Sequence, residues 1–316
     1  MVSSVVSPSD NPQIEAVKPR KKAMSDGLFS VLLIAPAMII ILFFALVPLG
    51  YAMDVSLRFA DLTRGGIKEF VGLENYRIVL FDNYFWKSVR VTLIFTICAV
   101  SIEMILGVFV AFLINGATVG KGLIRSLLIL PLATAPAVTG LFWRYLYDTQ
   151  FGLFNFFLGK LGLPQPNWLG DIDVALWAVI VFDVWQWMPY IALIVLAGLQ
   201  SLPKEPFEAA ELDGASYFKV LRRLTFPMLT PVLFLVGVLR TIDCLRLYDA
   251  VAVLTRGGPG SATETMTYYL YRTGLQFFRM DYASTMALLF LYAVVLASMF
   301  ALRPLLNRFA SRAQAR

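Results

Sequence analysis

The chain of 316 residues is 59% hydrophobic and only 15% charged, with a formal net charge of +6. A soluble domain of this size is nearer half apolar and about a quarter charged, so the composition indicates a protein whose main solvent is lipid. It has two cysteines and no histidine, which excludes a disulfide scaffold, His-based catalytic triads and the usual zinc sites.

The N-terminal segment, residues 1–27, is polar and ends in a basic cluster, which predicts a disordered cytoplasmic tail. Leu28–Met53 then runs without a charge and is too long for the core of a signal peptide. We therefore predict a first membrane helix there, which opens a transmembrane domain over 28–309. A short cytoplasmic tail, 310–316, is expected to follow.

Further apolar runs are each close to the ~20 residues that cross the hydrocarbon core. They predict five more membrane spans, at roughly 90–115, 124–146, 174–200, 227–250 and 282–303. Six spans place both termini on one side, and Lys and Arg are more numerous in the segments that share the N-terminal side. This bias predicts cytoplasmic termini.

Two outer loops, DLTRGGIKEFVGLENY and TRGGPGSATET, carry glycine pairs and turn formers. They predict ordered loops rather than strands. Trp86, Trp143 and Trp168 lie near span ends, where an aromatic belt is expected.

A charged stretch between two apolar runs, FEAAELDGASYFKVLRRLTFP from Phe207 to Pro227, is unlike the rest of this half of the chain. It predicts a short helix with acidic residues at its start, broken at Asp213-Gly214, then a second short helix before Pro227 opens the next span. An amphipathic helix resting on anionic lipid is one reading, and a docking element for a soluble partner is the other.

The string EAAELDGASYFKVLRRLTFPML resembles the EAA loop of ABC importer permeases, with Glu208, Ala209, Ala210, Asp213, Gly214 and Pro227 at matching positions. FVGLENYRIVL and GGPGSATETMTYYLYRTGLQFFRMDYASTMALL resemble the carbohydrate-uptake subclass, which includes maltose and glycerol-3-phosphate permeases. The resemblance implies an all-α membrane protein with six transmembrane helices of the type I ABC importer permease fold, in a bacterial plasma membrane. It also implies that the coupling loop, 205–227, contacts a cytoplasmic ATPase, through Glu208, Ala209, Ala210, Asp213, Gly214 and Phe218.

The partners that this resemblance implies are a second permease subunit, two copies of the ATPase and an extracytoplasmic solute-binding protein. The closest string to a P-loop, Gly152–Leu161, has the wrong glycine spacing and Leu after Lys160. We therefore expect no cofactor and no metal in this chain, with ATP and Mg bound by the partner ATPase. The sequence has no stripe of Lys and Arg residues of the kind that would indicate nucleic-acid binding.

Charges inside membrane spans are costly and are candidates for function. Arg240, Asp243 and Arg246 share a broad helix face, where Asp243 can pair with either arginine. Such a ladder could serve helix packing or line a sugar pathway near the midplane. For the second reading we predict substrate contacts from Asp183, Trp187, Arg240 and Asp243, with Trp185 and Gln186 behind them.

Two of the intramembrane residues have competing interpretations. Trp187 could equally serve helix packing, and Glu103 is expected to pair with a neighbouring helix or the partner subunit rather than with substrate. Two other kinds of protein also stay open: an autonomous secondary transporter and an intramembrane enzyme. The chain shows neither ten to twelve spans nor a GxSxG or HExxH motif. Sequence alone does not separate a sugar from a polyol or glycerol phosphate as the substrate.

Overall fold

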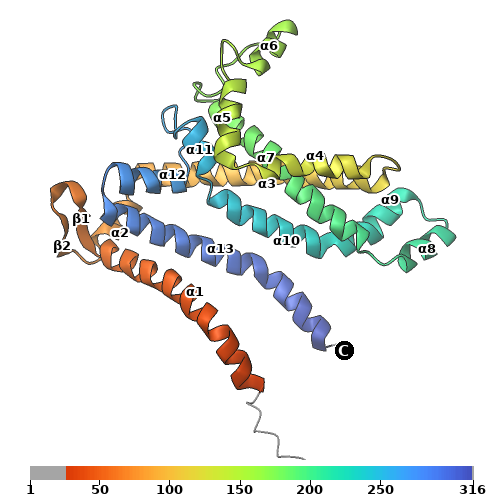
Figure 1. Ribbon diagram of the computed structural model, residues 1–316, viewed down its shortest axis with the longest axis horizontal. Coiled ribbons are helices and arrows are strands. Elements are labelled where there is room, and N and C mark those ends of the chain that lie inside the picture. The colour runs from red at the N-terminus through yellow and green to blue at the C-terminus, as the bar shows by residue number, and fades with distance from the viewer. Residues whose placement is uncertain (1–25, 315–316) are drawn as a thin grey trace, which may run out of the picture. The chain divides into compact units, whose positions relative to one another are not determined.

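A computed structural model describes residues 26–314 of the chain (Figure 1). The predicted N-terminal tail, 1–27, falls outside this range except for Asp26 and Gly27, which already belong to the first helix, α1 (Asp26–Ser56). The chain divides into two compact units, Met1–Tyr51 and Ala52–Arg316, and α1 passes from one into the other.

Within residues 26–314, five helical segments are long and apolar enough to cross a membrane. They are α1, α3 (Asn83–Gly116), α7 (Ala175–Gln200), the run Tyr217–Leu245, which contains α10 (Phe226–Leu245), and the first part of α13 (Met280–Gln314). The sixth predicted span, 124–146, is not one straight helix. It is a pair, α4 (Lys121–Ala133) and α5 (Pro136–Leu146), bent by 97°. The count of six therefore holds if the bent pair is one span.

Proline chemistry and one amide explain the bend. Pro136 stands at the start of α5 and has no N–H with which to continue α4. The side chain of Gln186 from α7 satisfies carbonyls at the end of α4: its Nε2 donates to the Thr134 carbonyl at 3.2 Å and to the Pro131 carbonyl at 3.4 Å, and its Oε1 accepts from Thr139 Oγ1 at 2.8 Å. Gln186 is thus a buried structural residue at the α4–α5 break.

The outer loop after α1 corrects the sequence prediction. Residues expected to form a loop without strands contain a two-stranded antiparallel sheet, β1 (Arg58–Asp61) and β2 (Gly66–Phe70), joined by the short turn η1 (Leu62–Arg64). The hairpin is held by the next helix, α2 (Glu74–Leu80), because Asn75 Nδ2 donates to the carbonyls of Ser56 and Arg58, at 2.8 Å each. Glycine-rich turn chemistry was read correctly, but not the short strands that it connects.

The ends of the helices also differ from the prediction. Helix α13 continues to Gln314, so most of the predicted tail at 310–316 is helical. The remaining short elements are α6 (Leu153–Lys160), α8 (Glu205–Leu212), α9 (Tyr217–Val220), η2 (Leu221–Thr225), α11 (Asp249–Leu254), α12 (Met266–Tyr271) and η3 (Arg272–Gln276).

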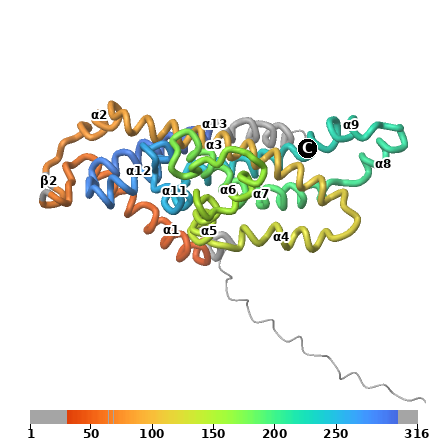
Figure 2. The backbone as a smooth tube through the Cα atoms, turned by 90° about the horizontal axis from the view of Figure 1, so that it is seen from above, coloured from red at the N-terminus to blue at the C-terminus, as the bar shows by residue number. Residues whose placement is uncertain are grey.

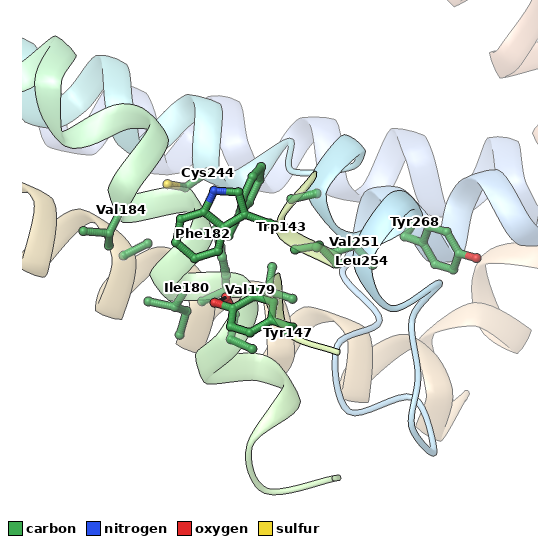
Figure 3. Close-up of a cluster of buried hydrophobic side chains, with 14 residues drawn as sticks. Trp143, Tyr147, Val179, Ile180, Phe182, Val184, Cys244, Val251, Leu254 and Tyr268 are labelled. Carbon is green, nitrogen blue, oxygen red and sulfur yellow. Dashed lines mark hydrogen bonds between the residues drawn. The ribbon is translucent and has the colours of Figure 1, made fainter. Parts of the chain in front are cut away.

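The packing centre of this unit is the pair α3 and α7, which make its most extensive helix–helix contact. Gly107 of α3 allows the close approach, because a Cβ there would lie 2.8 Å from Ile191 Cγ2 of α7. A second core joins α5, α7 and α11 (Figure 3). In it Trp143 packs edge-on against Phe182, with ring centroids 5.6 Å apart. Trp143 is therefore a core residue and not part of the predicted aromatic belt.

Candidate functional site

A polar cavity of about 270 Å³ lies where α5, α7, α10 and α11 meet. All four of the predicted pathway residues line it: Asp183 and Trp187 from α7, and Arg240 and Asp243 from α10. The cavity forms at this place because helices end here. Helix α10 ends at Leu245 and α11 begins at Asp249, and Pro136, the first residue of α5, lines the same cavity. Broken helices of this kind leave polar groups available inside a membrane protein.

Arg246, the third member of the charged ladder seen in the sequence, also lines the cavity. The rest of the lining adds residues that the sequence did not single out: Pro136, Phe182, Leu247, Tyr248, Asp249 and Ala250. The Tyr248 ring is in edge contact with Tyr271, with ring centroids 5.0 Å apart. The signal for Tyr248 was its place in LRLYDA, directly before the restart of the helix.

One wall of the cavity is a buried ion cluster. Arg240 donates from Nε to Glu103 Oε2 at 2.7 Å and from Nη2 to Glu103 Oε1 at 3.0 Å. Its Nη2 also donates to Asp183 Oδ2. The three residues are 0–2% exposed, and they tie α10 to α3 and to α7. The prediction that Glu103 pairs with a neighbouring helix is confirmed.

The expected pairing of Asp243 with Arg240 or Arg246 is wrong. Among the described residues, neither arginine forms an ion pair with Asp243, because Arg240 turns to the carboxylates of α3 and α7. Asp243 and Arg246 are exposed to the cavity side instead. Sequence spacing placed these charges on one face correctly but could not show that more deeply buried carboxylates on other helices compete for the guanidinium.

The aromatic residues divide by role. The Trp187 ring lies under the Arg240 guanidinium, with Cζ 5.1 Å from the ring centroid, and it lines the cavity. Trp185 contacts Trp143 at 5.2 Å between ring centroids and does not line the cavity. Neither Trp185 nor Gln186, the two further candidates for substrate contact, lines the cavity.

Glu103, Asp183 and Cys244 also bring three atoms of metal-ligand type within 4.8 Å of one another. The Arg240 guanidinium already lies between both of these carboxylates and supplies the positive charge. A second cation at this place would be repelled by it. The cluster is better described as an ion triad of one guanidinium and two carboxylates.

The charged loop, 205–227, projects from one end of the second unit, opposite the β1–β2 hairpin (Figure 2). Helix α8 ends in a tight turn in which Ala215 N donates to Ala210 O at 2.9 Å and Gly214 N donates to Glu211 O at 3.0 Å. Gly214 has φ +66° at this turn, a left-handed conformation that glycine adopts without cost. The break predicted at Asp213-Gly214 is confirmed.

The second half of the loop differs from the prediction. The short helix α9 is not separated from the next span by Pro227 but runs through the π-helical turn η2 into α10. In this turn the backbone N–H of Phe226 donates to the Leu221 carbonyl, directly before Pro227, which has no N–H to donate. The loop is thus mechanically continuous with the helix that carries Arg240.

Several side chains of the loop are largely exposed. Leu212 is 90% exposed and Phe218 is 78% exposed, and Glu208 forms no ion pair within the described residues. Behind the loop, Glu208 and Glu211 line a groove of about 700 Å³ with Phe112, Phe207 and Tyr217. Leu212 and Phe218 thus add apolar surface to the charged loop.

The model of a known family, the inner membrane component of binding-protein-dependent transport systems, matches residues 103–312. The chain belongs to this family. The matched range contains the ion triad, the cavity and the charged loop.

Named relatives agree with this assignment. This transport component is 42% identical over 82% of its length to a probable ABC transporter permease protein, y4oQ, of Sinorhizobium fredii, and covers 83% of that relative. It is 40% identical over 75% of its length to the trehalose/maltose transport system permease protein MalF of Thermococcus litoralis, covering 80% of it. It is also 35% identical over 86% of its length to the sn-glycerol-3-phosphate transport system permease protein UgpA of Yersinia pestis, covering 91% of it.

A solved structure shares the fold of this transport component. A chain of a bacterial ABC transporter involved in the import of alginate superposes with a TM-score of 0.77, covering 91% of this chain and 96% of that one, at 19% identity. The architecture is therefore the type I ABC importer permease fold, as the sequence motifs predict.

Proposed function

We propose that the chain is the membrane-spanning subunit of an ATP-driven importer for a sugar or a related polyol, and that it forms half of the translocation pathway. The observation that carries the proposal is the cavity of Asp183, Trp187, Arg240 and Asp243, placed where the helices are broken inside the membrane. Family membership supplies the transport function, and the cavity supplies the chemistry for a substrate.

The chemistry of this wall suits a polyhydroxylated ligand. Carboxylate and guanidinium groups form paired hydrogen bonds with neighbouring hydroxyls, while an indole face such as Trp187 packs against the C–H face of a sugar ring. The trehalose/maltose permease among the relatives carries a ligand of this class. The cavity of about 270 Å³ is slightly below the ~300–1,000 Å³ of typical ligand pockets, so we propose that a second permease subunit completes it.

Coupling to ATP hydrolysis is assigned to the charged loop. In this proposal α8 enters a cleft of a cytoplasmic ATPase, where Glu208 meets a basic residue and Phe218 fills an apolar pocket. The exposure of Leu212 and Phe218 supports a protein contact rather than a free surface. Two ATPase copies, the second permease subunit and an extracytoplasmic solute-binding protein complete the assembly.

The proposed topology has both termini in the cytoplasm of a bacterial cell, with the hairpin outside. The position of the hairpin and of the charged loop at opposite ends of the second unit fits this orientation (Figure 2). Single-span anchoring is ruled out by the number of apolar helices.

Reconstitution tests the proposed function. The chain is purified with the permease, ATPase and binding protein encoded beside it, placed in proteoliposomes with ATP inside, and supplied with the ligand that copurifies with the binding protein. We expect saturable uptake that needs ATP and is abolished by Glu208→Lys, while Glu205→Lys at the start of the same helix retains it. ATP-independent uptake by this chain alone would indicate an autonomous transporter instead.

A further inference from the structure

Glu103 is a buried residue next to the candidate cavity but not part of it. It is 0% exposed and absent from the cavity lining, yet it holds a residue that lines it, Arg240. A carboxylate inside a membrane span is costly, and this one contacts no solvent-accessible surface. The partner of Glu103, Arg240, indicates what Glu103 does. The arrangement of the cavity wall depends on where the Arg240 guanidinium lies.

The ion pair with Glu103 fixes the plane of the Arg240 guanidinium in addition to balancing its charge. Glu103 accepts one hydrogen bond from Arg240 Nε at 2.7 Å and a second from Nη2 at 3.0 Å, each on a different carboxylate oxygen. This two-point geometry allows one orientation of the planar guanidinium. Asp183 shares Nη2. Nη1 makes no hydrogen bond within the described residues, so it is the donor that this arrangement leaves for a ligand.

The same orientation sets the aromatic part of the wall. The guanidinium carbon lies 5.1 Å from the centroid of the Trp187 ring, a cation–π distance. If the guanidinium turned, both the stacking on Trp187 and the position of Nη1 would change together. Asp183 alone, with a single contact to Nη2, leaves rotation about that bond open.

We propose that Glu103 is a positioning residue for the substrate cavity: from the far side of Arg240 it orients the guanidinium so that Asp183, Trp187 and a free donor present one fixed polar wall. This inference rests on the proposed function for its substrate, but the geometric part is independent of it. Glu103 touches no ligand and acts through Arg240.

The charge balance of the triad allows Glu103 to be substituted without unfolding the protein. One guanidinium and two carboxylates give the triad a formal charge of −1. Glu103→Gln brings it to zero with nearly the same shape and leaves no buried charge unpaired. The variant should assemble, whereas its amide presents an N–H where the guanidinium needs an acceptor.

The first measurement is the substrate dependence of uptake by the reconstituted complex. We expect Glu103→Gln to raise KM about tenfold, the scale of one lost charge-assisted hydrogen bond, with kcat within twofold of wild type. Ile105→Ala, on the same helix at a position 69% exposed, is the matched control and should leave both values unchanged.

The second measurement needs no substrate. Cys244 is 0% exposed, with Sγ 3.9 Å from Asp183 Oδ2, and in a Cys98→Ser background it is the sole cysteine. Its alkylation rate by N-ethylmaleimide therefore reports on the order of the triad. We expect at least about a fivefold faster reaction in Glu103→Gln and no change in Ile105→Ala.

A raised KM together with faster alkylation supports the positioning role. An unchanged KM in an assembled variant overturns it, whatever the alkylation rate, because Glu103 would then serve packing alone. If Glu103→Gln does not assemble, Glu103→Asp, which keeps the charge but withdraws the carboxylate by one methylene, takes its place under the same criteria. Wild-type complex that imports no sugar overturns the proposed function, while Cys244 still shows whether Glu103 holds Arg240.

Discussion

Arg240 and Glu103, 137 positions apart in the chain, form a two-point ion pair between α10 and α3 in the interior of the helical unit. The pair shares its guanidinium with Asp183 of α7, so one cation joins three membrane helices. In the sequence Glu103 and Asp183 each stand alone in an apolar run, whereas Arg240 stands in a series with Asp243 and Arg246. Their association explains how two carboxylates persist in an apolar core.

The first prediction concerns the asymmetry of this triad. Arg240→Met removes its only positive charge and leaves two buried carboxylates, which should cost about 3–5 kcal/mol of stability. Asp183→Asn leaves the Glu103–Arg240 pair neutral and should cost far less. Thermal stability of the purified complex, followed by size-exclusion chromatography after heating, measures the difference. Arg246→Gln, in the same cavity but exposed, is the control and should remain within about 0.5 kcal/mol of wild type. Equal losses for Arg240→Met and Asp183→Asn would contradict this account.

A second prediction follows from the exposure of Asp243. Because it forms no ion pair with Arg240 or Arg246 within the described residues, both Asp243→Asn and Asp243→Ala should assemble normally. Each should raise the KM for uptake, since a hydrogen-bond acceptor is lost from the cavity wall. Asp183→Asn should raise it as well, from the facing helix. The measurement is a substrate-dependence curve for each assembled variant. If all three curves match wild type, the charges serve packing and the substrate binds elsewhere.

The turn at Gly214 gives a third prediction. A Cβ at this position meets nothing within 4 Å, so any effect of substitution comes from its φ of +66° and not from a clash. Asn adopts this conformation readily, whereas a β-branched side chain is strained there by about 1–2 kcal/mol. We expect Gly214→Val to reduce substrate-stimulated ATP hydrolysis severalfold and Gly214→Asn to retain it. The comparison uses the assembled complex, with binding-protein docking as the control that should not change.

Membrane topology makes the fourth prediction. In a Cys98→Ser, Cys244→Ala background, a cysteine at Glu69 on the hairpin or at Phe151, 88% exposed, should react from outside with an impermeant thiol reagent. A cysteine at Ser216 in the charged loop should react only after the membrane is permeabilised. These sites avoid Gly65, whose φ of +98° would strain a cysteine. Labelling in the reverse order would place the loop outside and remove its contact with an ATPase.

The sequence by itself determined the features that depend on local composition and spacing. Apolar runs of sufficient length specify membrane helices whatever they pack against, and the Asp213-Gly214 break follows from the conformational freedom of glycine. The motif around Glu208 resembles the family in residue types and spacing alone. Placement of Arg240, Asp243 and Arg246 on one face likewise needed only the helical repeat.

Tertiary structure alone decided which charges pair and where helices bend. Asp243 is the nearest carboxylate to Arg240 along the helix, but the guanidinium pairs with Glu103 and Asp183. These two carboxylates are buried together with Arg240, where an unpaired charge is most costly. At the 97° bend between α4 and α5 the Thr134 carbonyl accepts a hydrogen bond from Gln186, which lies 52 positions further along the chain. Ion pairing and helix bending depend on which side chains the fold brings together, and spacing along one helix carries no information about these contacts.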